Sequence, residues 1–248
     1  MRRKMPAVPQ DREREGREKD ACFCLWVDLG LSDYEEDFLF QERVVEARVG
    51  ERLPDTIILQ ENYPVLTMGR SAESCHLLIP ARLFQGECIS LLDVNRGGEI
   101  TYHGPGQLII SPIFKLKERG FNAHGYLHLL EEVTIRTLKS YGIEGQRIEG
   151  LRGVWVGEKK VAAVGIAIRR WTTFHGFCLN ANMDLRPFSY IIPCGIRHKK
   201  VTSLQELLGQ DVDMDQLKEQ VRDSMAAVFG LEIAPVSREG IEDLLRHP

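Results

Sequence analysis

Short apolar runs bounded by turn residues recur along the chain and predict β-strands. CFCLWVDLG at residues 22–30 is the first, and TIILQENY (56–63) and PVLTMG (64–69) are separated by a turn containing proline. GVWVGEKKVAAVGIAIRR (153–170) has two β-rich arms around Gly157 and Glu158, which is typical of a hairpin. Further strands are predicted in CISLLDVN (88–95), ITYHGPGQLIISPIFKL (100–116) and HGFCLNANMD (175–184).

Three stretches have helical periodicity instead. Residues 31–50 open with Ser32 and Glu35 at capping-box spacing and place Tyr34, Phe38 and Val45 on one side. A second helix is expected over residues 123–141, capped by Asn122, and a third over 214–229. Because strands outnumber helices and do not alternate strictly with them, the pattern predicts an α+β fold. The core positions expected in the second and third helices are Leu127, Leu130, Val133, Leu138, Leu217, Val221, Met225 and Val228.

Composition adds limits on the class of protein. The 248 residues are 43% hydrophobic and 27% charged, which suits a stable globule, and no linker favours two domains. Residues 1–20 are charged and lack periodic apolar positions, so we expect a disordered tail followed by one domain over 21–248. There is no apolar run long enough to span a bilayer and no signal-peptide core, so a cytoplasmic protein without membrane partners is expected. The net charge of −4 argues against general nucleic-acid binding.

Lys160 is the first residue with possible chemistry. Side chains alternate along a strand, so Lys160 should share a face with Ala162, Val164, Ile166 and Ile168. On such an apolar face a lysine either extends to the rim of the sheet or is held partly dehydrated, which would lower its pKa. Its neighbour Lys159 should point to solvent.

NRGGEITYHGPGQL at residues 95–108 contains four glycines, which let a ligand approach the backbone closely. The segment could wall a substrate site or form an ordinary pair of turns. It does not match the phosphate-loop patterns. His103 could be a ligand, a base or a hydrogen-bonded structural histidine, and the lack of partners at metal-ligand spacing favours the structural role.

Cys194 lies in IIPCGI, between a proline and a glycine, rather than inside a periodic apolar run. The six cysteines contain no CxxC pair and are expected to be reduced, so each is explained by packing or by chemistry. A thiol needs a nearby cation to be largely ionised at neutral pH, and Lys160 is a candidate. The alternatives are a Cys–His pair with His103 or His175 as base, and an inert cysteine in a turn.

Several of these motifs together resemble the octanoyl-[acyl-carrier-protein]:protein N-octanoyltransferase family of lipoate biosynthesis. The match runs from about Leu25 to Leu208 and contains RGGEITYHGPGQL, GVWVGEKKVAAVGIAI, FHGFCLNANMDL, PCGI and VTSL in this order. The resemblance implies one domain of the biotin/lipoate protein ligase type, with a larger and a smaller mostly antiparallel sheet flanked by helices. It also implies no cofactor and no metal.

Site residues follow from the resemblance position by position. Cys194 matches the nucleophile that carries the acyl group as a thioester, and Lys160 matches the lysine that lowers its pKa. The positions that match substrate-binding residues are Arg96, Gly97, Gly98, Glu99, Ile100, Thr101, Tyr102, His103, Ala163, Val164, Gly165, Gly176, Phe177 and Cys178.

The implied reaction moves an octanoyl group, without ATP, from octanoyl-acyl carrier protein to a lysine of apo lipoyl domains. The acceptors are the lipoyl domains of 2-oxoacid dehydrogenases and the glycine cleavage H protein. Alternatives are an amidotransferase acting between lipoyl-domain proteins, an ATP-dependent lipoate or biotin ligase, and a non-catalytic carrier-binding protein. Because both partners are acidic in this family, we expect a basic docking patch formed by Arg169, Arg170, Arg197, Lys199 and Lys200.

Overall fold

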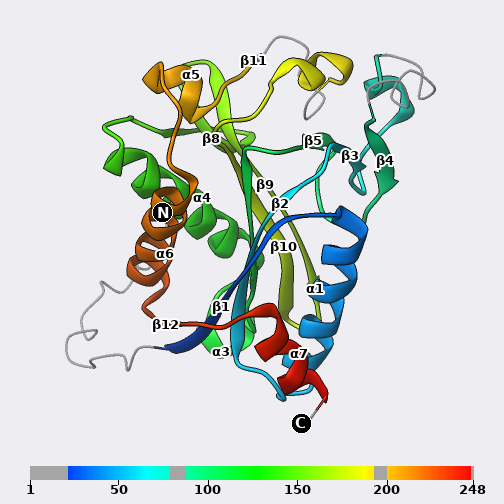
Figure 1. The fold of residues 1–248 in the computed structure, drawn as a ribbon, viewed down its shortest axis with the longest axis vertical. Coiled ribbons are helices and arrows are strands. Elements are labelled where there is room, and N and C mark those ends of the chain that lie inside the picture. Colours follow the sequence, from blue (N-terminus) through cyan, green and yellow to red (C-terminus); the bar gives the residue numbers. More distant parts are fainter. Residues whose placement is uncertain (1–21, 79–87, 193–199, 247–248) are drawn as a thin grey trace, which may run out of the picture.

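The computed structural model describes residues 22–78, 88–192 and 200–246. They form a nine-stranded sheet and a three-stranded sheet flanked by helices (Figure 1). The strand order of the large sheet is β12-β1-β2-β6-β10-β9-β8-β7, with β11 paired to β9. The pairs β1–β12, β1–β2 and β9–β11 are parallel and the other pairs are antiparallel. The predicted α+β class is confirmed.

The strands of the large sheet are β1 (Cys22–Ser32), β2 (Asp55–Asn62), β6 (Gln107–Ile113), β7 (Gln146–Ile148), β8 (Leu151–Val156), β9 (Lys159–Arg169), β10 (Thr172–Asn180), β11 (Lys200–Val201) and β12 (Leu231–Pro235). The small sheet has the order β4-β3-β5, formed by β3 (Val65–Met68), β4 (Ser90–Asp93) and β5 (Ile100–His103). The helices are α1 (Tyr34–Val49), α3 (Leu116–Arg119), α4 (Ala123–Ser140), α5 (Leu204–Leu208), α6 (Met214–Phe229) and α7 (Arg238–Arg246), with short 3₁₀ turns η1 (Ser74–His76) and η3 (Arg186–Tyr190).

Two hydrophobic clusters attach helices to opposite faces of the large sheet. On one face, α4 and α6 pack on the strands through Tyr126, Leu130, Val133, Leu217 and Val221. On the other face, α1 and α7 contribute Phe40, Val44, Val45 and Ile241 (Figure 1). A third cluster joins the small sheet to η3, with Tyr102 against Phe188.

The helix ends follow local capping chemistry, with one difference from expectation. Asn122 accepts a hydrogen bond from the Gly125 amide, as predicted for the start of α4. The cap of α1 is Asp33, whose carboxylate accepts from the amides of Glu35 and Glu36, and the predicted capping box at Ser32 is wrong. Ser32 is the last residue of β1 and donates to Asp37 instead. The strand continues two residues further than predicted, which moves the helix start to the next side chain able to cap it.

The β9–β10 hairpin closes through a two-residue turn, Arg170 and Trp171, between the paired residues Arg169 and Thr172. Both turn residues have positive φ, 49° and 68°, as a turn matching the twist of a hairpin requires. Neither is glycine, so the turn is held in a conformation that costs side chains about 1 kcal/mol each. No register shift interrupts the eight pairs that follow, from Arg169 to Ala162 on β9.

Candidate active site

A cavity of about 650 Å³ lies over the large sheet, between α1 and the small sheet, and extends along β9. Its floor includes a row of side chains from four neighbouring strands: Gln60 on β2, Ile109 on β6, Cys178 on β10 and Ala163 on β9. Small residues at this end of β9 and β10 leave the space open. Tyr34, Phe38 and Gln41 of α1 form one wall.

The glycine-rich segment after β4 crosses β9 above this floor. The Gly97 amide donates to the Ile166 carbonyl at 2.8 Å. A Cβ at Gly165 would lie 2.8 Å from the Gly97 carbonyl oxygen, so only glycine fits at this crossing. The segment is thus a wall of the site, as one of the two alternatives for residues 95–108 predicted.

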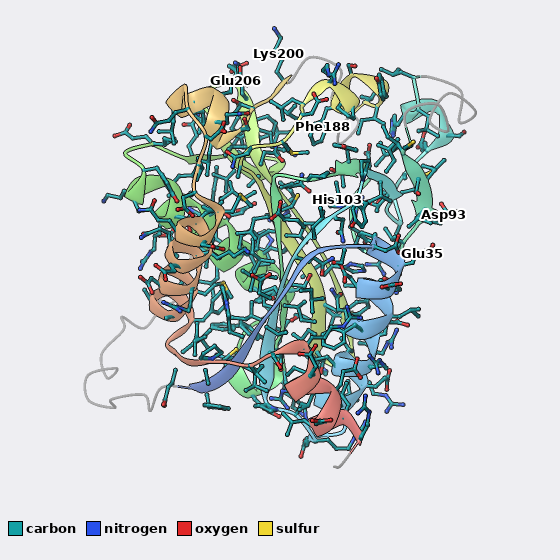
Figure 2. All side chains as sticks on the ribbon, in the orientation of Figure 1. Glu35, Asp93, His103, Phe188, Lys200 and Glu206 are labelled. Carbon is teal, nitrogen blue, oxygen red and sulfur yellow. The ribbon has the colours of Figure 1, made fainter. Side chains whose placement is uncertain are left out.

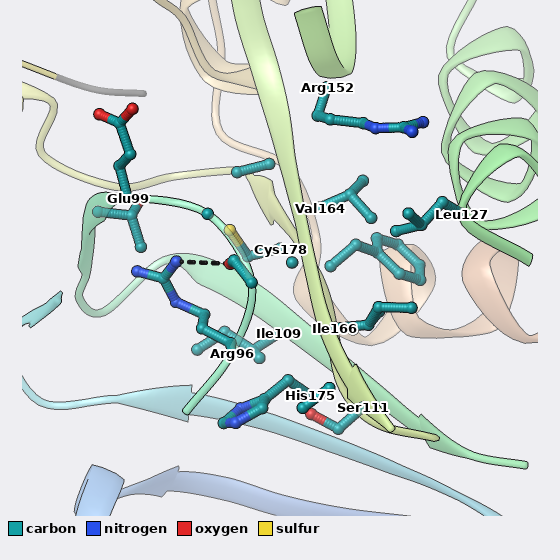
Figure 3. Close-up of a pocket in the computed structure, with 18 of the residues that line it drawn as sticks. Arg96, Glu99, Ile109, Ser111, Leu127, Arg152, Val164, Ile166, His175 and Cys178 are labelled. Atoms are coloured by element: carbon teal, nitrogen blue, oxygen red, sulfur yellow. Dashed lines mark hydrogen bonds between the residues drawn. The ribbon is translucent and has the colours of Figure 1, made fainter. Parts of the chain in front are cut away.

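Arg96 anchors the same segment from inside the protein. Its side chain is buried and donates from Nη2 to the carbonyl and to the hydroxyl of Thr67, both at 2.8 Å. Nη1 donates to the Gly97 carbonyl at 3.2 Å, the dashed line in Figure 3. The guanidinium therefore fixes the loop to β3 and brings a positive charge into the cavity wall.

His103 is the last residue of β5 in the small sheet (Figure 2) and is a hydrogen-bonded histidine, as the structural role predicted. Nδ1 lies 2.7 Å from Gln107 Oε1 and Nε2 lies 3.3 Å from the Thr67 hydroxyl. Burial, aided by the charge of Arg96, lowers the pKa of His103 to about 4. The imidazole is therefore neutral at pH 7.

Gln107 connects His103 to the strand that carries Lys160. Its Nε2 donates to Asn180 Oδ1 at 2.8 Å, and Asn180 Nδ2 donates to the Thr202 carbonyl at 2.9 Å. The Thr202 amide in turn donates to the Lys160 carbonyl at 2.9 Å. Residues of the HGPGQ, FHGFCLN and VTSL motifs therefore form one buried network that ends at the backbone of Lys160.

His175 also lines the cavity, on β10, with a positive φ of 53°. Nε2 lies 2.7 Å from Asn95 Oδ1, and the ring stacks on Phe38 with centroids 5.3 Å apart. Burial first, and then the charge of Arg96, lower the pKa of His175 to about 3. His175 is one of the two bases that the Cys–His alternative named, and the lowered pKa makes it a weak acceptor for a thiol proton.

Lys160 is the second residue of β9 and lines the cavity. Its side chain is 7% exposed and Nζ lies 4.9 Å from the centre of the Trp155 ring. A register shift places Lys160 opposite Trp155 while Ala162 lies opposite Val154, so the alternation of faces is interrupted at Val161. Ala162 and Ile166 belong to one core cluster and Val164 packs against it, so the bulge takes Lys160 off the face that it was predicted to share with them. Lys160, Val164, Ile166 and Ile168 nevertheless all line the cavity. The low exposure of Lys160 argues against the alternative in which its side chain extends to the rim of the sheet.

The cavity extends around both sides of β9. Figure 3 shows Arg96, Ile109, Ser111 and His175 on one side of the strand, and Val164, Ile166, Leu127 and Arg152 on the other. We name these parts the α1 limb and the α4 limb, after the helices that wall them. They are continuous because β8 pairs with β9 only as far as Ala162.

Nearly all described residues of the predicted site meet in this cavity. Lys160 and thirteen of the fourteen predicted substrate-binding residues line it. Tyr102 is the exception: its ring packs on Phe188 in the third cluster, because neighbouring residues of β5 point to opposite faces. Cys194 lies outside the described residues.

The predicted basic patch is not one surface. Arg169 is the last residue of β9 and Arg170 follows it, whereas Lys200 pairs with Lys159, the first residue of β9. An eleven-residue strand is about 35 Å long, so these charges are far apart. Arg169 is also paired with Glu42 and Glu46 at 2.7 Å each, and Lys200 lies near Glu206 (Figure 2). Arg197 and Lys199 lie outside the described residues.

Several lining residues had no signal in the sequence. Gln41, Gln60 and Ser111 are isolated polar residues in apolar runs, and Arg70 and Arg152 are ordinary charged positions. Tyr34 and Phe38 were expected on one side of a helix, but that periodicity does not distinguish a cavity wall from the core. Tyr34 and Phe38 line the cavity because α1 packs beside the small sheet, which the sequence does not reveal.

One group of possible metal ligands occurs among the described residues. Glu73, Cys75 and His76 place their ligand atoms within 4.8 Å of one another, and His76 Nδ1 lies 3.0 Å from Glu99 Oε2. Glu73 and Cys75 are exposed.

No helix within the described ranges is both long and apolar enough to cross a bilayer.

Comparison with known proteins agrees with this geometry. Residues 33–226 match the family model "Lipoyl protein ligase A/B catalytic domain". A protein of Caldicellulosiruptor saccharolyticus named octanoyltransferase is 41% identical over 220 residues, covering 88% of this chain and 94% of the relative. An octanoyltransferase of Roseiflexus sp. is 42% identical, covering 86% and 90% of the two chains.

Solved structures share the fold at low identity. A lipoate-protein ligase A bound with ATP has a TM-score of 0.75 at 14% identity, covering 90% of this chain and 93% of its own. A putative lipoate protein ligase of T. acidophilum with bound lipoic acid has a TM-score of 0.72, covering 91% and 93%. The fold is therefore that of the lipoate protein ligases. Taken with the relatives above, this chain belongs to the octanoyltransferases of the lipoyl protein ligase A/B family and is an acyltransferase.

Proposed function

We propose that the chain transfers an octanoyl group from octanoyl-acyl carrier protein, through a thioester on Cys194, to the lysine of apo lipoyl domains. The acceptors are lipoyl domains of 2-oxoacid dehydrogenases and the glycine cleavage H protein, and the reaction takes place in the cytoplasm without ATP. Residues 21–248 form the catalytic domain and 1–20 a tail outside it. The observation that carries the proposal is a buried lysine, Lys160, in a cavity lined by residues of three motifs of the family.

In the first half-reaction the Cys194 thiolate attacks the carbonyl carbon of the donor thioester. The carbon–sulfur bond to the carrier breaks, the leaving carrier sulfur takes a proton from the Lys160 ammonium and departs as a thiol, and the octanoyl group remains on Cys194. The Lys160 ammonium favours the thiolate by its charge, which a low-polarity site strengthens. Contact between Lys160 Nζ and the Trp155 ring supports a fixed position for this charge.

In the second half-reaction the acceptor lysine attacks the Cys194 thioester. The amine loses a proton, an amide forms, and the Cys194 sulfur leaves. Lys160, neutral at this stage, takes the proton from the incoming amine as general base. Thioester exchange is nearly balanced in energy and amide formation from a thioester is favourable, so no nucleotide is consumed.

The acyl chain lies in the α1 limb, along the small residues Gly97, Ala163, Gly165 and Gly176. The small side chains of Ala163 and Cys178 leave the limb open beside Ile109 and Phe38. Cβ atoms at Gly165 and Gly176 would instead meet the carbonyl oxygens of Gly97 and Ile110, so these positions need glycine for close backbone packing. Burial of each methylene contributes about 0.8 kcal/mol, so an eight-carbon chain gains several kcal/mol of binding free energy. The neutral His103 and His175 avoid placing additional charges against this apolar chain.

Intact-mass measurement tests the proposal. Octanoyl carrier and the full chain are mixed without nucleotide, and we expect a mass gain of one octanoyl group that hydroxylamine removes and Cys194→Ala prevents. Cys88→Ala, at a cysteine that is exposed, is the matched control and should still be acylated. An apo lipoyl domain added next should acquire the octanoyl group on its lysine.

Two outcomes would contradict it. Acylation of Cys194→Ala with a hydroxylamine-sensitive bond would identify another nucleophile. Pyrophosphate release from ATP and free octanoate, with no transfer from the carrier, would identify a ligase instead.

A further inference from the structure

The α4 limb has an open strand edge in its wall. β8 pairs with β9 from Lys159 to Ala162, and β9 continues to Arg169. No described strand pairs with this side of β9 beyond Ala162, and Ala163–Ile168 line the cavity. The only backbone bond to this edge from the described residues is the one from the Gly97 amide to the Ile166 carbonyl.

The direction of the backbone groups follows from that bond. In an antiparallel pair, opposite residues alternate between exchanging two hydrogen bonds and exchanging none. Because the Ile166 carbonyl points away from β10, Ile166 and His175 form a pair without mutual bonds, and so do Val164 and Phe177 two residues earlier. The amide and carbonyl of Val164, and the amide of Ile166, therefore face the cavity.

The surroundings of this edge are apolar with a cation at one end. Leu127 of α4 and Leu151 of β8 line the limb beside Val164 and Ile166. Arg152 is exposed and its Nη2 lies 3.1 Å from His124 Nδ1. Among the described residues, no carboxylate forms an ion pair with Arg152, so its charge is not neutralised by them.

We propose that the α4 limb binds the phosphopantetheine-type arm of the acyl donor. The amides of the arm form hydrogen bonds with the main chain of Val164 and Ile166, and the phosphate binds Arg152. This inference rests on the proposed function, because it assigns the second limb once the acyl chain occupies the first. The thioester then lies where the limbs meet, near Lys160.

An arm fits this edge better than a peptide strand of the acceptor. The open segment between the end of β8 pairing at Ala162 and the Gly97 bond at Ile166 offers three main-chain groups, over about 13 Å. A peptide added to a sheet edge needs a longer ladder of bonds. A narrow chain with two amides and one phosphate needs only these groups and one cation.

Donors that contain successive parts of the arm provide the test. They are the octanoyl thioesters of 2-acetoxyethanethiol, N-acetylcysteamine, pantetheine and phosphopantetheine, each used with the full chain and an apo lipoyl domain. The first two differ only by an ester in place of an amide. We expect kcat/KM to rise about fivefold with each amide group that is added to the thioester, because each forms a single hydrogen bond. Addition of the phosphate should raise it about tenfold, because the contact with Arg152 is charge-assisted.

Arg152→Gln should reduce the phosphopantetheine-to-pantetheine ratio of kcat/KM from about ten to near one. The matched variant is Arg70→Gln, since Arg70 is also an exposed arginine that lines the cavity but belongs to the loop after β3. That variant should keep the ratio. The ratio compares two donors on the same variant, so loss of stability alone does not change it.

Four results would overturn the inference while leaving the proposed function intact. Three of them are equal kcat/KM for all four thioesters, loss of the phosphate ratio in Arg70→Gln but not in Arg152→Gln, and an effect of Arg152→Gln on the acceptor KM alone. The last would assign the limb to the acceptor. Transfer from the carrier but not from phosphopantetheine would place recognition on the carrier surface and also overturn it, whereas no transfer from octanoyl carrier would refute the proposed function itself.

Discussion

The amide of Thr202 donates to the carbonyl of Lys160 at 2.9 Å, so the residue proposed as base is held by its backbone as well as by its ring contact. Val201 pairs with Lys160 in parallel register just before this bond. The VTSL motif therefore acts on the site by fixing β9, although no residue of that motif lines the cavity. Pairing with Val201 and the bond from Thr202 therefore position Lys160 through its backbone, while its side chain carries the proposed chemistry.

Substitutions of Lys160 should affect the two half-reactions differently. Lys160→Met removes both charge and base, and we expect overall transfer to fall by about 10²–10⁴. Lys160→Arg keeps a charge but cannot act as a base near neutral pH, so acylation of Cys194 should be reduced less than transfer to the amine. Single-turnover intact-mass measurements resolve the two steps. Equal loss of both steps in Lys160→Arg would contradict the assignment of the base.

Gln107→Leu should destabilise the fold, because it leaves the buried Nδ1–H of His103 and Oδ1 of Asn180 without their partner. We expect the free energy of unfolding to fall by about 2–4 kcal/mol, measured by urea denaturation. Gln146→Leu, which removes one exposed hydrogen bond to the Gly157 carbonyl, is the control and should change it by about 0.5 kcal/mol or less. A similar change in the free energy of unfolding for the two variants would mean that the hydrogen bonds of Gln107 do not stabilise the fold.

Gly165→Ala should displace the glycine-rich segment, because the new Cβ would lie 2.8 Å from the Gly97 carbonyl. We expect kcat/KM for the octanoyl donor to fall by about tenfold or more, as a misplaced wall no longer orients the substrate. Gly50→Ala is the control: its φ is −82° and its closest Cβ contact would be 3.4 Å, remote from the cavity wall. Unchanged kinetics in Gly165→Ala would show that the crossing tolerates the shift.

The two buried histidines should make stability depend on pH. Both folded pKa values, about 4 for His103 and about 3 for His175, lie below the unfolded value of about 6.5. The unfolded chain therefore binds more protons below pH 6.5, and stability that is present above this pH is lost as pH falls toward the folded values. Each histidine contributes a slope of up to about 1.4 kcal/mol per pH unit in that window.

Comparison of the wild type with His103→Gln isolates one of these slopes. The variant should show a smaller decrease in the free energy of unfolding between pH 6.5 and 4.5, measured by urea denaturation at each pH. Asp37 acts in the opposite direction, because burial raises its pKa to about 6, but it is present in both proteins and cancels. Parallel pH profiles would mean that His103 is protonated in the folded state.

Elements with strong local signals could be predicted from sequence alone. The helix Met214–Phe229 has the predicted bounds, because Asp213 caps its start and Gly230, with a φ of 64°, ends it. The β8–β9 hairpin follows from Gly157 and Glu158 in the same way. Ser32 failed as a cap because β1 extends to it, and strand pairing with β2 is a long-range effect that capping patterns do not contain.

The site was predictable where motifs carry it, and not where packing creates it. The glycine-rich segment was singled out by its glycines, and Lys160 by the apolar face that it was predicted to share. Ala163, Val164 and Gly165 were assigned only through the family resemblance. The bulge at Val161, the wall formed by Phe38, and the separation of Arg169 from Lys200 all depend on strand register and on how elements pack together. Charges that flank motifs in the sequence are therefore a poor guide to a docking surface.

The turn at Arg170 and Trp171 sets a limit on how the site can vary. Two residues with positive φ close the hairpin, and no register shift follows. The length of the turn therefore determines which residues of β9 and β10 lie opposite each other. One inserted residue there would slide the strands past each other, remove Gly165 from beneath the loop and exchange which backbone groups are available to a substrate. Length changes in this enzyme should therefore be tolerated at other loops and excluded from this one, even though it lies far along the strand from Lys160.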